Sequence, residues 1–212
     1  MPLIKEETAL KKLQKHLAGF RSIVQGGWDD LLALFERFPE LRTIWSATTK
    51  ATVVHDFQIG RACLYAESVD GVRVQDSGGM KVMVVDSQFA IRMKKLDDRL
   101  LPSNQLTDQV KDFRGQQQLP GFPKTYNLDL GYVLNRAQTT LEQIFLVFPN
   151  GPSQNYWESD LLQADAAGQK RVIELFEHLK PQESEEEDDA TTVRPKRDGT
   201  APLKRESDDE KS

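Results

Sequence analysis

The sequence has one cysteine, three histidines and no long apolar run, and each shortage removes a class of protein from consideration. Cys63 has no partner for an internal disulfide, which fits a reducing compartment, and its apolar neighbours predict a small core residue. The longest apolar runs, residues 31–35 and 144–148, fall far short of the roughly 20 residues of a membrane helix. The opening MPLIKEETALKKL has no apolar stretch typical of a secretory signal. We therefore expect a soluble, cytoplasmic protein without membrane insertion.

Common metal-binding and catalytic motifs are also missing. His16, His55 and His178 lie far apart, and there is no HExxH, CxxC or phosphate-loop motif. We expect no metal and no cofactor, and the sequence identifies no catalytic residue. Asp129 and Glu142 stand on predicted strands, but neither has the nearby lysine that a metal-dependent nuclease would use.

The net charge of −5 arises from one end of the chain. Residues 181–212 carry six Lys or Arg and eleven Asp or Glu, which leaves 22 of each sign in residues 1–180. The acidic balance therefore does not argue against a basic patch elsewhere on the protein.

Residues 181–212 are expected to form a disordered, charged tail. They contain no aromatic residue, and Val193 and Leu203 are their only large aliphatic residues. Such a segment cannot bury enough apolar surface to offset an ordering cost of about 1–2 kcal/mol per residue. The tail either keeps the protein soluble or serves as an interaction arm, in which the acidic residues 183–189 mimic nucleic acid or shield a basic patch.

Apolar residues recur at helical spacing in the N-terminal third. We predict one helix that ends at Gly26-Gly27, a second over residues 28–38 and a turn that begins at Pro39. A further helix is predicted over residues 49–68, where the β-branched residues also suit a strand. The apolar positions of the first helix are Leu10, Leu13, Leu17, Phe20 and Val24.

After residue 71 the apolar pattern alternates as in strands. The predicted strands are residues 72–74, 80–86, 89–95, 127–135 and 141–148, with an edge strand at 156–157, and short helices are predicted at 106–114 and 165–179. Helices followed by hairpins indicate an α+β fold: N-terminal helices packed on an antiparallel sheet of two or more hairpins, then a C-terminal helix. We expect a single domain over residues 1–180, followed by the tail.

The segment GGMKVMVVDSQFAIRMKKLDDRLL, residues 78–101, predicts a charged hairpin. A turn at Ser87-Gln88 would place Val84 opposite Ile91, Val82 opposite Met93, Met83 opposite Arg92 and Lys81 opposite Lys94. Two lysines directly across a ladder repel each other, so a carboxylate, water or an anionic ligand should compensate.

The candidate site is therefore a set of basic residues on and beyond this hairpin: Lys81, Arg92, Lys94, Lys95 and Arg99. They are predicted to contact either an acidic protein partner or a phosphate backbone. The alternative is a solvated sheet face with no ligand.

Four segments carry a resemblance to a known group of proteins. Each of them resembles a segment of small uncharacterised bacterial proteins. The four segments are GGMKVMVVDSQFAIRMKKLDDRL, QLPGFP, LDLGYVLN and IFLVFPNG. Those proteins are encoded beside genes for helix-turn-helix proteins with a zinc-peptidase-like (ImmA/IrrE) domain, in suspected toxin–antitoxin or phage-defence pairs. The resemblance covers roughly residues 54–157, carries no catalytic signature, and implies a protein partner and a bacterial or phage genome.

Two functions follow as hypotheses. The first is a partner-binding protein, one component of a bacterial toxin–antitoxin-like or phage-defence module. The second is a nucleic-acid-binding protein or nuclease that uses the basic hairpin over residues 81–99.

Overall fold

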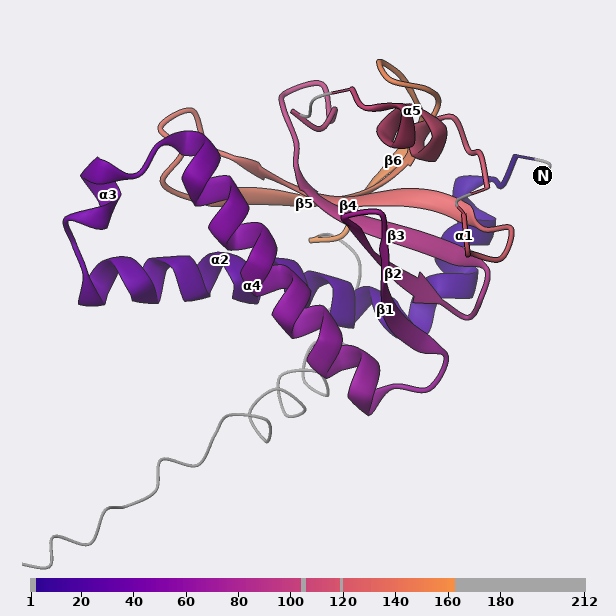
Figure 1. Cartoon of the computed structure of the whole chain (residues 1–212), viewed down its shortest axis with the longest axis horizontal. Helices are drawn as coiled ribbons and strands as arrows, with labels where there is room; N and C mark the ends of the chain where they lie inside the picture. Colours follow the sequence, from indigo (N-terminus) through magenta and orange to yellow (C-terminus); the bar gives the residue numbers. More distant parts are fainter. Residues whose placement is uncertain (1–2, 104–105, 119, 163–212) are drawn as a thin grey trace, which may run out of the picture. The chain divides into compact units, whose positions relative to one another are not determined.

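The computed structural model describes residues 3–103, 106–118 and 120–162, and it has the predicted α+β organisation. The helices come first (Figure 1). Their bounds are α1 (Glu6–Leu13), the 3₁₀ turn η1 (Gln14–His16), α2 (Leu17–Arg37), α3 (Leu41–Ile44) and α4 (Ala47–Ser68). A single short helix, α5 (Asp108–Arg114), lies between the described strands.

Six described strands form one sheet in sequential order. They are β1 (Val72–Ser77), β2 (Met80–Val85), β3 (Phe89–Lys95), β4 (Tyr126–Leu134), β5 (Leu141–Pro149) and β6 (Asn155–Asp160). Neighbours are antiparallel except β3 and β4, which run parallel. The expectation of a purely antiparallel sheet was therefore wrong at this pair. The segment between these strands is long enough to cross over and includes α5, whereas a hairpin turn would have reversed the chain.

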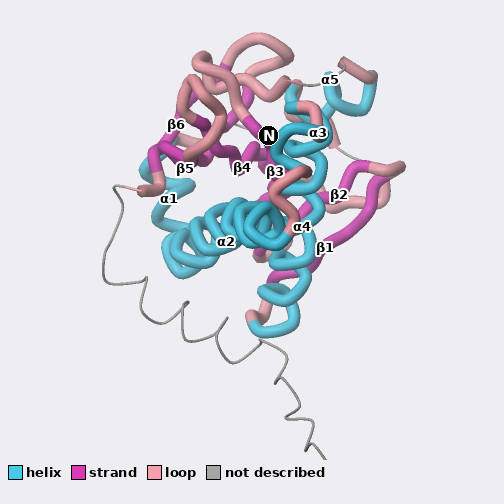
Figure 2. Tube along the Cα trace, turned by 90° about the vertical axis from the view of Figure 1, so that its left-hand side faces the viewer, coloured by secondary structure: helices cyan, strands magenta, loops and turns pink. Residues whose placement is uncertain are grey.

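The sheet separates two apolar layers. On one face, α2 and α4 pack over alternate residues of the strands and form the main core (Figure 2). Leu128, Leu130 and Tyr132 lie in this core, as their alternation in the sequence predicted. On the other face a smaller cluster gathers around α5 and includes Val84, Ala90 and Phe113, with Val82 and Phe122.

Gly26 and Gly27 do not end a helix, because α2 continues through both of them. A Cβ at position 27 would lie 2.6 Å from Cγ of Gln58 and 3.3 Å from the carbonyl oxygen of Val54, both on α4. The glycines therefore allow the two helix backbones to approach closely. The break comes earlier, at η1, between Leu13 and Leu17.

The predicted hairpin register was wrong by one position. Val85 pairs with Phe89, and Met83 pairs with Ile91. Asp86 and Ser87 both adopt positive φ angles, of 49° and 54°, and the amide of Gln88 donates to the carbonyl of Val85 at 3.0 Å. The turn is thus centred one residue earlier than Ser87-Gln88, and a shift of one residue changes every cross-strand pair.

Thr107 caps α5, with its hydroxyl accepting from the amide of Val110. Cys63 is exposed on α4, so its expected place in the core was wrong, and the helical periodicity turns its side chain outward. The predicted helix over 165–179 and the charged tail over 181–212 lie outside the described residues. No helix in the described ranges has the length and hydropathy needed to cross a membrane.

Candidate anion-binding site

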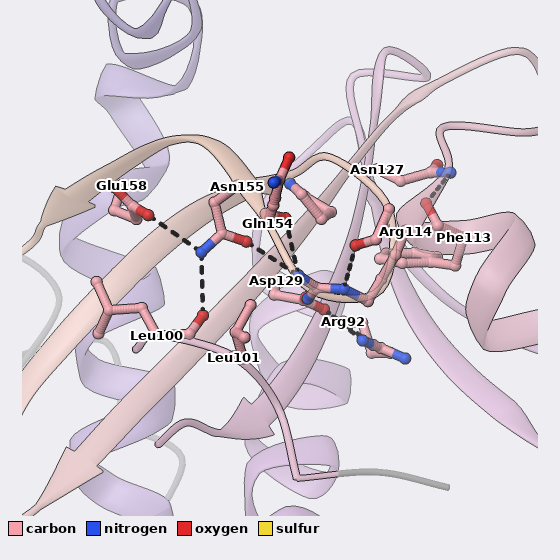
Figure 3. Close-up of polar contacts among 12 residues, drawn as sticks. Arg92, Leu100, Leu101, Phe113, Arg114, Asn127, Asp129, Gln154, Asn155 and Glu158 are labelled. Carbon is pink, nitrogen blue, oxygen red and sulfur yellow. Dashed lines mark hydrogen bonds and ion pairs between the residues drawn. The ribbon is translucent and has the colours of Figure 1, made fainter. Parts of the chain in front are cut away.

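Three charged side chains meet beneath α5 in the interior of the protein (Figure 3). Arg92 on β3 lies directly opposite Asp129 on the parallel strand β4, and its Nε donates to Oδ1 at 2.9 Å. Arg114, the last residue of α5, donates from Nη1 to the other carboxylate oxygen at 2.6 Å. All three side chains are at most 1% exposed. We call this group the buried triad.

Arg114 has a structural role because its remaining donors are used within the protein. Its Nε donates to the carbonyl of Gly151 at 2.9 Å. Its Nη2 donates to the carbonyl of Gln154 and to Oδ1 of Asn155, at 3.2 and 2.9 Å (Figure 3). These bonds join α5 to the turn between β5 and β6, and they fix the position of the Asp129 carboxylate.

Arg92 is less completely satisfied. Its Nη1 is buried and has no hydrogen-bond partner among the described residues, while Nη2 lies 2.8 Å from Asp129 in a purely ionic contact. Its guanidinium carbon lies 4.8 Å from the centre of the Phe113 ring, a cation–π contact. Two guanidinium groups share one carboxylate, so the buried triad carries a formal charge of +1. An uncompensated buried charge is costly, and a nearby anion would relieve that cost.

Arg92 faces a cavity of about 300 Å³ that we call the basic pocket. The strands β2 and β3 pair only between their hairpin turn and Met83. Farther from the turn, β2 pairs with β1 alone and β3 pairs with β4 alone, and the pocket lies in the gap between them. Gln109 on α5 bonds to Ser77 across one side of the opening. The ionisable side chains that line the pocket are His55, Lys81, Arg92 and Lys94, and none of the described lining residues is a carboxylate.

The electrostatics of the basic pocket disfavour positive charge in the absence of an anion. Burial lowers the pKa of Lys94, the charge of Arg92 lowers it further, and Asp129 acts in the opposite direction. Burial also lowers the pKa of His55, again reinforced by a neighbouring cation, Lys94. A bound anion would reverse both effects, since it favours the charged forms.

The five basic residues predicted from the sequence do not form one surface. Lys81, Arg92 and Lys94 come together in the basic pocket. Lys95 bonds to Gln138 at 3.0 Å and lines a second cavity, while Arg99 is exposed in the turn after β3 and lines neither. The pairing of β2 with β3 ends at Met83 and does not reach Lys81, so the predicted pairing of Lys81 with Lys94 was wrong. The cross-strand partner of Lys81 is Asp76 of β1.

Sequence reasoning missed three members of this region: His55, Arg114 and Asp129. Asp129 carried a usable signal, because a single carboxylate on an otherwise apolar strand needs a buried cation. Its partners depend on the parallel pairing of β3 with β4, which the hairpin interpretation excluded. Within the described ranges no three His, Cys, Asp or Glu residues are grouped closely enough to hold a metal ion.

Comparison with known proteins gives no relative to set beside this geometry: no family model, curated protein or solved structure matches the chain.

Proposed function

We propose that this protein is a binding protein, and that its basic pocket receives a phosphate group of its ligand. The observation that carries the proposal is the buried Arg92 guanidinium, with Nη1 unpartnered among the described residues, in a cavity lined by two lysines and no described carboxylate. Phosphate oxygens accept several charge-assisted hydrogen bonds at once, which suits one arginine and two lysines that converge on one cavity.

The shape of the pocket favours a single phosphate group over the side of a nucleic-acid duplex. A duplex backbone requires an extended basic surface, whereas here Lys95 lines a different cavity and Arg99 lines neither, so the basic residues are not gathered on one surface. The pocket lies instead in the gap where two strands diverge. If the ligand is a nucleic acid, it must therefore be one that can insert a phosphate group into the basic pocket.

Titration with inorganic phosphate tests this proposal, with chemical shifts or calorimetry as the readout. We expect Lys94→Gln to weaken phosphate binding at least tenfold, because it removes a partly desolvated cation from the pocket wall. The matched control is Lys11→Gln, which changes the net charge equally but lies on the exposed face of α1. Added sodium chloride should weaken binding in the wild type.

Two results would overturn the proposal. One is the absence of phosphate binding at millimolar concentration in the wild-type protein. The other is equal phosphate affinity in Lys94→Gln and Lys11→Gln. Arg92 is unsuitable for this test, because its removal also takes a partner from the buried Asp129.

A protein partner is the second candidate function, as one component of a toxin–antitoxin-like or phage-defence module. It is supported by the resemblance described above and by exposed apolar residues in one corner of the protein. This corner is the region where the chain turns from α2 to α4 (Figure 1). Phe38, which precedes α3, is 41% exposed. Ile44, the last residue of α3, is 70% exposed. Exposed large apolar side chains near one corner of a protein are candidates for an interaction surface.

Co-expression with the product of the adjacent gene tests the partner hypothesis. Ile44→Asp should abolish co-purification if the α3 corner is the contact, whereas Leu64→Asp, an exposed apolar position on α4, should not. The hypothesis fails if the neighbour is not of the helix-turn-helix and peptidase-like type, or if the two proteins do not co-purify.

A further inference from the structure

A second cavity, of about 630 Å³, adjoins the basic pocket. We call it the side cleft. His55 on α4 and Lys94 on β3 line both cavities, so these two side chains form their common boundary. Both volumes fall within the range of about 300–1,000 Å³ that is typical of small-molecule sites.

The side cleft contains a polar side chain without a partner. Gln58 on α4 is 1% exposed and lines the cleft, and neither its Nε2 nor its Oε1 has a hydrogen-bond partner among the described residues. A buried amide in this state loses its hydration without compensation, which is unfavourable. An amide offers a donor and an acceptor side by side, so it matches a ligand edge with the complementary pair.

Apart from Lys94, which it shares with the basic pocket, the side cleft has balanced charges. Lys95 and Arg136 line it, and so do Asp97 and Asp98. The cleft therefore has no excess positive charge for a second phosphate. The arrangement is a basic pocket at one end and a neutral, hydrogen-bonding cleft at the other, with His55 and Lys94 between them.

We infer that the ligand is a mononucleotide, which places its phosphate in the basic pocket and its base in the side cleft against the Gln58 amide. This inference rests on the proposed function, because it assigns the phosphate to the same pocket. A nucleobase presents adjacent donors and acceptors on its edge, as the amide requires. A nucleotide also joins an anionic group to a neutral, hydrogen-bonding ring, and the two adjoining cavities offer those two environments in that order.

The test compares wild-type affinities for inorganic phosphate, ribose 5-phosphate, the four common nucleoside monophosphates and the corresponding nucleosides. At least one nucleoside monophosphate should bind tenfold or more tightly than ribose 5-phosphate, which lacks the base. Gln58→Leu should reduce the affinity for that nucleotide to the affinity for ribose 5-phosphate, and it should leave the affinity for inorganic phosphate unchanged. Lys94→Gln should weaken every phosphate-bearing ligand.

Each outcome separates the two proposals. If phosphate binds but all nucleoside monophosphates match ribose 5-phosphate within twofold, the nucleotide inference is overturned and the phosphate pocket stands. If nucleosides bind as tightly as their monophosphates and inorganic phosphate does not bind, both the phosphate pocket and the nucleotide inference are overturned. If Gln58→Leu does not fold, the wild-type comparison with ribose 5-phosphate still decides.

Discussion

Asp129 is the residue on which two buried guanidinium groups depend. Its carboxylate accepts from Arg92 with one oxygen and from Arg114 with the other, and it is fully buried. Removing the common partner of buried charges is far more costly than removing a surface ion pair, because the remaining charges stay out of water.

We expect Asp129→Asn to lower the free energy of unfolding by about 3–5 kcal/mol, measured by chemical denaturation. The control is Asp108→Asn, since Asp108 forms an exposed pair with Lys111 one turn along α5 and its loss should leave the thermal midpoint unchanged. Similar stabilities for the two variants would show that the buried triad does not hold α5 against the sheet.

His16 makes folding sensitive to mild acid. It is fully buried between Tyr65 and Asp86, with Nδ1 2.8 Å from the Tyr65 hydroxyl oxygen. Burial lowers the pKa of His16 below 6.5; Asp86 opposes this shift and Lys15 adds to it. At pH values between the pKa of His16 in the folded protein and 6.5, the unfolded chain binds more protons than the folded chain. The stabilisation that comes from burying neutral His16 is therefore complete above about pH 6.5, and it is lost as the pH falls through the pKa of His16 in the folded protein.

The free energy of unfolding should therefore decrease from pH 7.5 to pH 5.5. His55 contributes in the same direction, because its pKa is also lowered by burial. We expect His16→Gln to be less stable at pH 7.5 but to show a shallower decrease over this range. Equal slopes for the variant and the wild type, from denaturant titrations at each pH, would contradict this assignment.

At the scale of elements, α2 and α4 depend on a close approach at Gly26 and Gly27. Side-chain atoms of Gln58 and Arg61 occupy the space where Cβ atoms would be. Glycine normally weakens a helix by about 1 kcal/mol relative to alanine. The two glycines therefore lower the helix propensity of α2, but they allow it to pack closely against α4.

Gly27→Ala and Gly60→Ala should have opposite effects on stability. At position 27 the added methyl group meets Gln58 and the backbone of Val54, and the thermal midpoint should fall. Gly60 lies in the middle of α4, and a methyl group there would meet no described atom within 4 Å outside the backbone of its own helix. Alanine at position 60 should therefore stabilise the protein by about 0.5–1 kcal/mol. If both variants are stabilised, the two helices are not held at the distance described.

The elements themselves were largely predictable from the sequence, whereas their pairing was not. Alternation placed Leu128, Leu130 and Tyr132 on the core face, and helical spacing located α4 within two residues of its observed start. Both patterns are local. The register of β2 with β3 and the parallel pairing of β3 with β4 depend on a turn with positive φ angles and on a crossover, which short-range periodicity does not encode.

The candidate site shows the same division. Lys81, Arg92 and Lys94 could be selected because basic residues are unusual on a half-buried hairpin, and they do line one pocket. Asp129 and His55 reach the region only through long-range packing, from β4 and α4.

At the scale of the whole molecule, the main core of the described residues joins the helical layer to the sheet. It extends from Leu13 and Phe35 in the helices to Ile91 and Phe148 in the strands. A layer that shares its core with the sheet should not unfold separately from it. Thermal unfolding of the wild type should therefore follow one transition, whether it is monitored by tryptophan fluorescence or by far-ultraviolet circular dichroism.

Phe35 tests this continuity near one end of the core. It is 6% exposed, lies against Trp45 at 6.0 Å between ring centres, and is approached by Arg42 and Lys50 on its ring face. We expect Phe35→Ala to lower the free energy of unfolding by about 3–5 kcal/mol while both probes keep a common midpoint. Phe38→Ala is the control, because that ring is 41% exposed just after α2 and its loss should change stability little. A small effect at Phe35, or fluorescence and dichroism midpoints that separate, would mean that the helices fold independently of the sheet that holds the basic pocket.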